Sequence, residues 1–233
     1  MKIKSVKFNF IMNFILTASN FIFPLITFPY VSRVLGASGT GKVSFAISVV
    51  SYFTMVAALG IPTYGIRTTA KVRDDQEKLN RTTQEILSIH LFMMLLVSIV
   101  YILAILFVPR FQSDRTLFLV VGVSILLDPL GVNWLYQRLE QYGYIAKRSI
   151  FLKFVGVILM FMFIHSPDDY VFYGVTSILA SAGSNVLNFI NLRKYVSLKP
   201  VGNYDIKQHL KPILILFAQV VAVNIYTNLD NVM

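Results

Sequence analysis

The chain has 233 residues, of which 56% are hydrophobic and only 14% are charged, against a charged share of about a quarter in soluble domains. This composition excludes an ordinary soluble domain, and the apolar residues come in runs of roughly twenty, enough to cross a hydrocarbon core of about 30 Å. The absence of cysteine excludes disulfides and thiolate metal sites. The net charge of +10 falls between the apolar runs, so it indicates membrane topology and argues against nucleic-acid binding.

The first apolar run, about residues 8–31, has the clearest pattern. It follows a short basic segment, but it is longer than a secretory signal core of about 7–15 residues and has no small-residue cleavage site, so we interpret it as a retained span. Six positions recur at steps of three and four, which places them on one helical face. They are Asn9, Asn13, Thr17, Asn20, Pro24 and Thr27. An amide is costly in hydrocarbon, so this face should meet protein or a watery cavity.

Five more spans and the start of a seventh follow in chain order. They are predicted at about residues 43–62, 86–108, 116–137, 149–165 and 170–191, and from Pro212 onward. Pro212 suits a first helical position because its missing N–H has no intrahelical partner there. The fold class is therefore an all-α integral membrane protein. We expect a six-helix lobe over residues 1–192, a linker over 193–211 and the first helix of a second lobe over 212–233.

The sixth span carries a second face of small and polar residues. Its members are Gly174, Ser177, Ser181, Ser184, Asn188 and Asn191, again spaced by three and four. Such faces hold membrane helices together through hydrogen bonds worth about 0.6 kcal/mol each, or they line a water-filled space. Because the pattern continues over the whole of both spans, we favour the water-facing wall.

The distribution of basic residues predicts the orientation. The N-terminus and the connections after the second, fourth and sixth spans hold nearly all of the Lys and Arg residues. The alternate side holds only Arg33, Lys42, Arg110 and Arg115. Cytoplasmic loops are enriched in Lys and Arg, so the N-terminus is predicted to lie in the cytoplasm.

Asp128 is the strongest functional candidate within a predicted span. It lies about midway along the fourth span, immediately before Pro129. A charge at membrane depth is costly and usually faces a cavity or a partner. Two interpretations stay open. Asp128 is either a cation or proton site that titrates during transport, or a structural carboxylate that pairs with a basic residue or caps a broken helix.

Two basic residues near the predicted span ends also have two interpretations each. Arg33 and Lys153 can present positive charge to an anionic substrate, or they can extend to opposite membrane interfaces. For Lys153 the interfacial position is favoured, and for Arg33 both stay open. The role of Asp230 is open. The full set of candidate translocation residues is Asn13, Thr17, Asn20, Arg33, Asp128, Asn133, Lys153, Ser181, Asn188 and Asp230.

Enzyme and metal motifs are absent from the sequence. It contains no HExxH, no GxSxG, no phosphate-binding glycine loop and no paired-carboxylate motif, so we expect no catalytic residue, cofactor or metal. His90, His165 and His209 fall at predicted span ends or in loops and are interpreted as interfacial. Trp134 and Tyr136 are interpreted as part of an interfacial aromatic belt.

Three segments resemble one family. PYVSRVLGASGTGKVSFAISVVSYFTMVAALGIPTYGIRTTAKVRDD, DPLGVNWLYQRLEQYGYIAKRS and IYTNLDNVM resemble, in this order, segments of bacterial polysaccharide-repeat-unit flippases, the Wzx-type transporters of O-antigen and capsule. These belong to the multidrug/oligosaccharidyl-lipid/polysaccharide exporter superfamily. Arg33 matches the turn of the first segment. The resemblance implies about twelve spans in two six-helix lobes, of which this chain corresponds to the first lobe and one helix of the second.

The resemblance also implies an activity. Such a protein flips undecaprenyl-pyrophosphate-linked oligosaccharide repeat units across the bacterial cytoplasmic membrane, by ion-coupled alternating access around a central cavity. Its partners would be this lipid-linked glycan and membrane lipid, with a polysaccharide polymerase and a chain-length regulator as further candidates. The assignment of Asp128 to ion coupling is our own inference from the residues. Three alternatives stay open: a drug/cation antiporter of the same superfamily, a membrane polysaccharide polymerase or glycosyltransferase, and an inactive truncated product.

Overall fold

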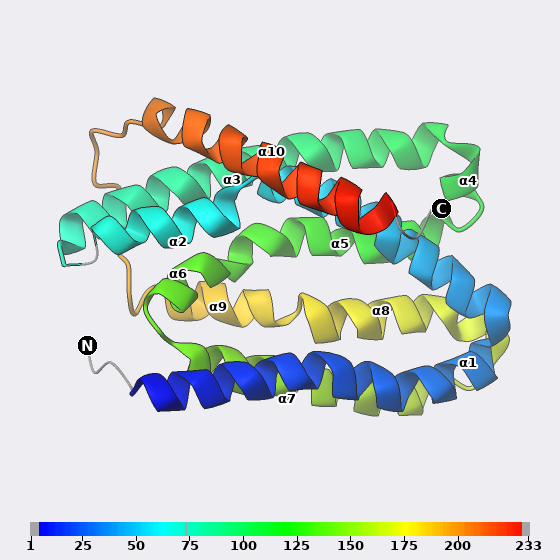
Figure 1. Cartoon of the computed structure of the whole chain (residues 1–233). Helices are drawn as coiled ribbons and strands as arrows, with labels where there is room; N and C mark the ends of the chain where they lie inside the picture. The colour runs from blue at the N-terminus through cyan, green and yellow to red at the C-terminus, as the bar shows by residue number, and fades with distance from the viewer. Residues whose placement is uncertain (1–4, 73, 230–233) are drawn as a thin grey trace.

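The computed structural model describes residues 5–72 and 74–229, and it contains helices but no strand within these ranges (Figure 1). Three stretches are long and apolar enough to cross a membrane: Val6–Lys71, Gln76–Phe107 and Arg115–Arg138. These findings confirm the expected all-α membrane protein. The number of seven spans and the domain boundaries stay predictions.

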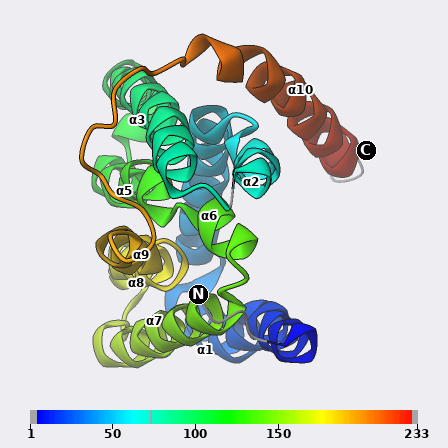
Figure 2. The same ribbon diagram turned by 90° about the vertical axis from the view of Figure 1, so that its left-hand side faces the viewer.

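The helices follow one another with short connections, except for one longer loop before the last. Their bounds are α1 Val6–Ala58, α2 Ile61–Lys71, α3 Gln76–Phe107, α4 Pro109–Gln112, α5 Arg115–Gly131, α6 Asn133–Arg138, α7 Tyr142–Phe163, the 3₁₀ turn η1 Pro167–Asp169, α8 Tyr170–Ser181, α9 Ser184–Leu192 and α10 Lys207–Leu229. Figure 2 shows α10 outside the other helices, beside α2.

The first two predicted spans are joined by a single sharp break. Residues 6–58 are helical except at Gly36, whose φ of 65° and ψ of −176° reverse the direction of the chain (Figure 1). The predicted connection with Ser32, Arg33 and Lys42 is therefore wrong, because all three lie within helical turns. Only glycine adopts this backbone region readily, so one residue makes the turn.

Helix starts differ from the predicted ones in three places. The third span begins at Gln76, the fifth at Tyr142 and the seventh at Lys207, each earlier than the first apolar residue of its run. Pro212 consequently lies inside α10 and not at its first position. Polar first turns extend these helices beyond the hydrocarbon, where hydropathy alone cannot detect them.

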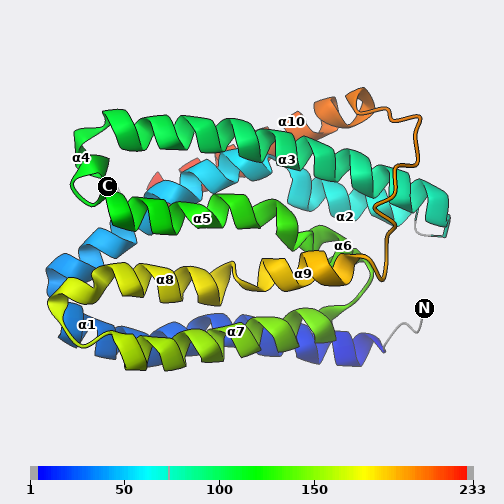
Figure 3. The same cartoon turned by 180° about the vertical axis from the view of Figure 1, so that it is seen from behind.

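The connections predicted to be cytoplasmic lie together. The N-terminal end of α1, the α2–α3 connection, the α6–α7 connection and the loop before α10 all fall at one end of the bundle, which we call the basic end (Figures 1 and 3). The Gly36 break, α4 and η1 lie at the other end. In the η1 turn, backbone N–H groups of His165 and Ser166 donate to the Asp169 carboxylate and hold its pKa below the ordinary value.

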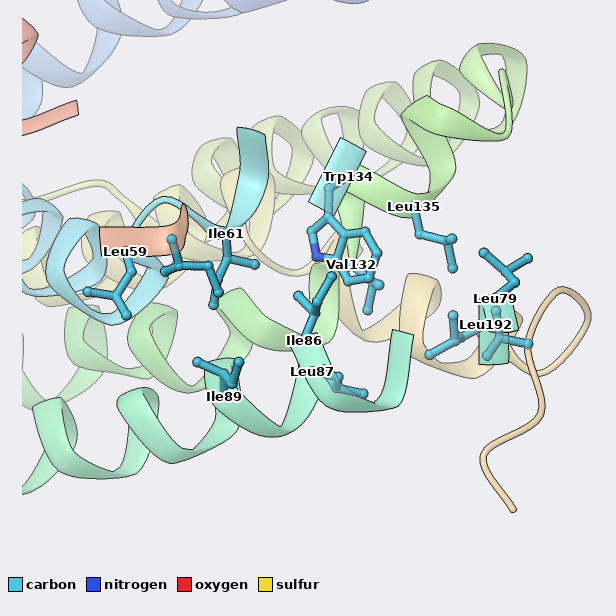
Figure 4. Close-up of a cluster of buried hydrophobic side chains, with 12 residues drawn as sticks. Leu59, Ile61, Leu79, Ile86, Leu87, Ile89, Val132, Trp134, Leu135 and Leu192 are labelled. Carbon is cyan, nitrogen blue, oxygen red and sulfur yellow. The ribbon is translucent and has the colours of Figure 1, made fainter. Parts of the chain in front are cut away.

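Two apolar clusters make most of the core. One lies toward the basic end and includes Ile61, Ile86, Leu135 and Trp134 (Figure 4). The other joins the second half of α1 to α3 and α5. Trp134 is 4% exposed and Tyr136 is fully buried, so the interpretation as an interfacial belt is wrong. The Trp134 ring packs on α2 where a Cβ on Gly65 would come within 2.5 Å of it.

The apolar helix α3 presents one face to the outside. Phe92, Leu95 and Ile99 are largely exposed, whereas Val97 and Tyr101 face the core. An exposed apolar face of this kind is suited to contact with lipid.

Candidate functional site

A groove with a single lysine lies between the first half of α1, α7 and α8. Its volume is about 280 Å³. Its polar lining residues come from all three helices, and its apolar lining is mainly aromatic on the α1 side. The polar ones are Asn20, Thr27, Lys153, Thr176, Ser177 and Ser181. The groove thus brings the polar face of the first span next to that of the sixth, and we call it the lysine groove.

Lys153 lies at the middle of α7 and reaches α1. Its Nζ donates to the Ser19 hydroxyl at 2.9 Å and to the Asn20 side-chain oxygen, and it lies 5.7 Å from the centroid of the Phe23 ring. The favoured interfacial position is therefore wrong for Lys153. The helix begins at Tyr142, and this early start places the lysine several turns from the basic end.

Close packing sets the width of the lysine groove. A Cβ on Gly156 of α7 would lie 3.0 Å from the Ala180 Cβ and 3.2 Å from the Thr176 carbonyl of α8. On the other side, the Phe23 and Phe154 rings meet edge to face at 5.4 Å and hold α1 against α7. Small residues therefore close one side of the groove and aromatic rings the other. The Ser181 hydroxyl donates back to the Ser177 carbonyl at 2.8 Å.

The remaining predicted residues of the first span lie on the same exposed side of α1. Asn13 is exposed and lines a second groove of about 420 Å³ at the basic end, together with Asn9, Arg138 and Glu140. Asn9 donates to the Glu140 carboxylate at 3.3 Å. Thr17 is exposed and lies between the two grooves in the sequence.

Asn133 and Asn188 belong to a buried polar cluster around Arg148. Asn188 is fully buried and donates to the Gly131 carbonyl and to the Asn133 side-chain oxygen. Arg148, which is 6% exposed, donates to the same Asn133 oxygen at 2.6 Å and to Ser184. The expected water-facing position is wrong for Asn188, because its amide compensates the broken backbone between α5 and α6.

Asp128 pairs with a histidine that sequence reasoning placed at an interface. The His90 Nε2 lies 3.1 Å from the Asp128 Oδ2, and the side chains are 5% and 32% exposed, respectively. The partner is thus a histidine of α3 and not a lysine or arginine. A histidine within an otherwise apolar run was the available signal, but the sequence alone does not show which carboxylate it meets.

A second buried histidine was also missed. His209 of α10 lies with its Nε2 2.8 Å from the Glu85 Oε2 of α3 and its Nδ1 2.7 Å from the Tyr64 hydroxyl of α2. Glu85 lies inside α3, although it precedes the span predicted at residues 86–108. Within the described part of the chain, no three His, Asp or Glu side chains gather as metal ligands.

The last two predicted residues lie elsewhere. Arg33 is exposed on α1, just before the Gly36 break and at the end opposite the basic loops. Asp230 lies outside the described residues. Of the nine candidates that the structure describes, it joins Asn20, Lys153 and Ser181 in one groove and places the other six apart from it.

Comparisons with known proteins agree with the resemblance seen in the sequence. The family model "Polysaccharide biosynthesis protein" matches residues 6–233. A protein of Escherichia coli (strain K12) named "Putative O-antigen transporter" is 22% identical over 228 residues, covering 96% of this chain and 54% of that protein. One of the same name from Shigella dysenteriae is 23% identical, covering 95% and 56%. The chain spans about half the length of these relatives. No solved structure matches.

Proposed function

Because the chain belongs to the polysaccharide biosynthesis protein family, we propose that it forms one half of a transporter for undecaprenyl-pyrophosphate-linked oligosaccharide repeat units, in the bacterial cytoplasmic membrane and with a cytoplasmic N-terminus. The observation that carries this proposal is the lysine groove. A cation there lies among amides, hydroxyls and aromatic rings, on the side of α1 that the rest of the described chain leaves exposed.

The substrate of such a transporter has three chemical parts. Its pyrophosphate is anionic, its glycan offers many hydroxyls and its isoprenoid tail is apolar. Lys153 supplies charge for the first part, since a charge-assisted hydrogen bond to phosphate is among the stronger polar contacts. Asn20 and Ser181 can bond sugar hydroxyls, and the exposed rings of Phe21 and Phe28 suit the edge of an apolar chain.

Ion coupling is assigned to the pair of Asp128 and His90. The pair consists of an imidazole and a carboxylate, whose Nε2 and Oδ2 atoms lie 3.1 Å apart, and it joins α3 to α5. Protonation of such a pair changes the attraction between the two helices, which is the kind of bias that alternating access needs. A polysaccharide polymerase and a chain-length regulator are the partners expected to use the exported units.

The lining of the lysine groove distinguishes this function from drug/cation antiport. A cation exporter needs acidic groups where its substrate binds, because opposite charges must compensate the loss of hydration. Among the described residues that line the lysine groove, there is one lysine and no Asp or Glu. The groove therefore favours an anionic substrate.

Lys153→Gln tests the proposal, because it removes the charge and keeps a polar side chain of similar length. Loss of a hydrogen bond to a charged group costs about 1.5–3 kcal/mol, so we expect transport to fall roughly tenfold to a hundredfold at limiting substrate. The measurement is the amount of surface polysaccharide in cells whose chromosomal copy carries the change.

Lys147→Gln is the matched control. Lys147 lies on the same helix and is exposed outside the groove, so this variant should export normally. Deletion of the gene sets the zero level. Wild-type polysaccharide in the Lys153→Gln cells would remove the groove from the mechanism, and wild-type polysaccharide in the deletion strain would favour an inactive chain.

A further inference from the structure

A larger groove at the basic end lies between α2, α3 and α10, and it shares no residue with the lysine groove. Its volume is about 640 Å³. Three exposed cations line it: Arg67 and Lys71 from α2, and Lys211 from α10. Within the described ranges, its lining includes no Asp or Glu, and none of the three cations forms an ion pair. This arrangement leaves a concentrated positive charge without an internal partner.

A threonine hydroxyl also lines the same groove. Thr82 of α3 lines the groove and is 9% exposed, and its hydroxyl makes no hydrogen bond to any residue that the structure describes. A hydroxyl without an internal partner can donate a hydrogen bond to an acceptor oxygen of a ligand in the groove.

The walls of the groove are fixed by a buried polar cluster. The side chain of His209 is 3% exposed and that of Glu85 is 1% exposed. The imidazole bridges this carboxylate and the Tyr64 hydroxyl, and the Asp205 backbone N–H donates to the other carboxylate oxygen at 2.7 Å. Both oxygens of the Glu85 carboxylate thus already have partners within this cluster. A prearranged site of this kind loses little free energy in ordering its side chains on binding.

The groove continues into an apolar surface. Pro212, Ile215 and Leu216 of α10 line it beyond the cations, and Leu214 and Ile215 are 56% and 60% exposed. One end of the site therefore suits an anionic group and the other an alkyl chain. Basic pockets between membrane helices on the cytoplasmic side bind anionic lipid headgroups for this reason.

We propose that the groove between α2, α3 and α10 binds the phosphate of an anionic phospholipid, with Arg67, Lys71 and Lys211 around the phosphate, the Thr82 hydroxyl donating to it and the acyl chains along α10. The bound phosphate bridges cations of α2 and α10. The lipid therefore strengthens the attachment of α10, the helix after the long loop, to the helices before it.

The test measures lipid binding to the purified full chain in detergent by native mass spectrometry. The probes are short-chain phosphatidylglycerol, phosphatidylcholine with the same chains, inorganic phosphate and undecaprenyl pyrophosphate. We expect phosphatidylglycerol to bind most tightly. Each cation contributes roughly fivefold in affinity, so Arg67→Gln with Lys211→Gln should weaken binding by roughly twentyfold. Thr82→Val, which changes no charge, should also weaken it.

The matched control is Arg193→Gln with Lys194→Gln, which removes the same charge from exposed positions at the same end but outside the groove. This control should keep wild-type affinity, and circular dichroism checks the fold of every variant. Four results would overturn the proposal: equal binding of phosphatidylcholine, equal loss in the control pair, inorganic phosphate binding as tightly as the lipid, or undecaprenyl pyrophosphate displacing phosphatidylglycerol. None of these four binding results depends on Lys153 or on polysaccharide export, so they test this proposal separately from the proposed function.

Discussion

At the scale of single residues, the pairing of Asp128 with His90 changes what the aspartate can do. A lysine or arginine would place a permanent positive charge beside the carboxylate, whereas an imidazole has both a neutral and a charged form. The imidazole is almost fully buried and the carboxylate is one-third exposed, so the aspartate is the more accessible member of the pair.

Asp128→Asn should abolish coupling to the ion gradient and leave insertion of the chain intact. The amide keeps the volume and one oxygen that can accept a hydrogen bond from His90, so the change in stability should stay within about 1 kcal/mol. The measurement is surface polysaccharide together with the abundance of the chain in membranes. Asp168→Asn, on the exposed η1 turn, is the control. Normal export in the Asp128 variant would exclude this carboxylate from the mechanism.

Sequence reasoning found the polar residues of the spans but not their partners. The spacing of Asn20 and Ser181 predicted faces that now lie along one groove. It could not distinguish Lys153, which reaches α1, from Arg148, which is buried against Asn133 and Ser184. Arg148 immediately precedes the predicted fifth span, and Lys153 lies about one turn inside it. Their difference depends on the start of α7 and on the angle at which neighbouring helices pack, which hydropathy does not encode.

At the scale of elements, the reversal inside α1 depends on one backbone conformation. Gly36 has a positive φ, yet a Cβ placed on it would meet nothing within 4 Å. The same is true of Gly41, which has ordinary helical geometry. A side chain would have room at both glycines, and only the backbone conformation differs between them. Substitution of the two therefore measures the effect of that conformation alone.

We expect Gly36→Ala to lower the free energy of unfolding by about 1–3 kcal/mol, because a side chain makes this region of φ and ψ unfavourable. Gly41→Ala should raise it by up to about 1 kcal/mol, since alanine loses less entropy than glycine in a helix. Denaturant unfolding of the detergent-solubilised chain, followed by the fluorescence of Trp134, measures both. Equal effects of the two substitutions would mean that the Gly36 conformation does not hold the break.

At the scale of the whole molecule, the two ends of the bundle differ in charge. Arg67, Lys147, Arg193 and Lys199 are exposed at the basic end, whereas the η1 turn at the other end carries Asp168 and Asp169. The sequence predicted that the connections alternate between the two sides of the membrane, with the basic ones on one side. The N-terminal end of the first span and the connections after the second, fourth and sixth predicted spans should therefore lie at one end of the bundle, and they do (Figure 1). The predicted sixth span is divided in the structure, because a break at Ala182 and Gly183 separates α8 from α9.

The proposed orientation rests on this charge difference, and single cysteines can test it because the chain has none of its own. Cytoplasmic positions hold the excess of Lys and Arg, so a cysteine at Asp168 should react with a membrane-impermeant maleimide in intact cells. A cysteine at Lys199 should react only after permeabilisation. Both positions are exposed, so access to the reagent is limited by the membrane alone. A cysteine at the buried Asn188 should stay unlabelled in both conditions. Labelling of Lys199→Cys in intact cells, with protection of Asp168→Cys, would reverse the orientation and place the phospholipid groove in the outer leaflet.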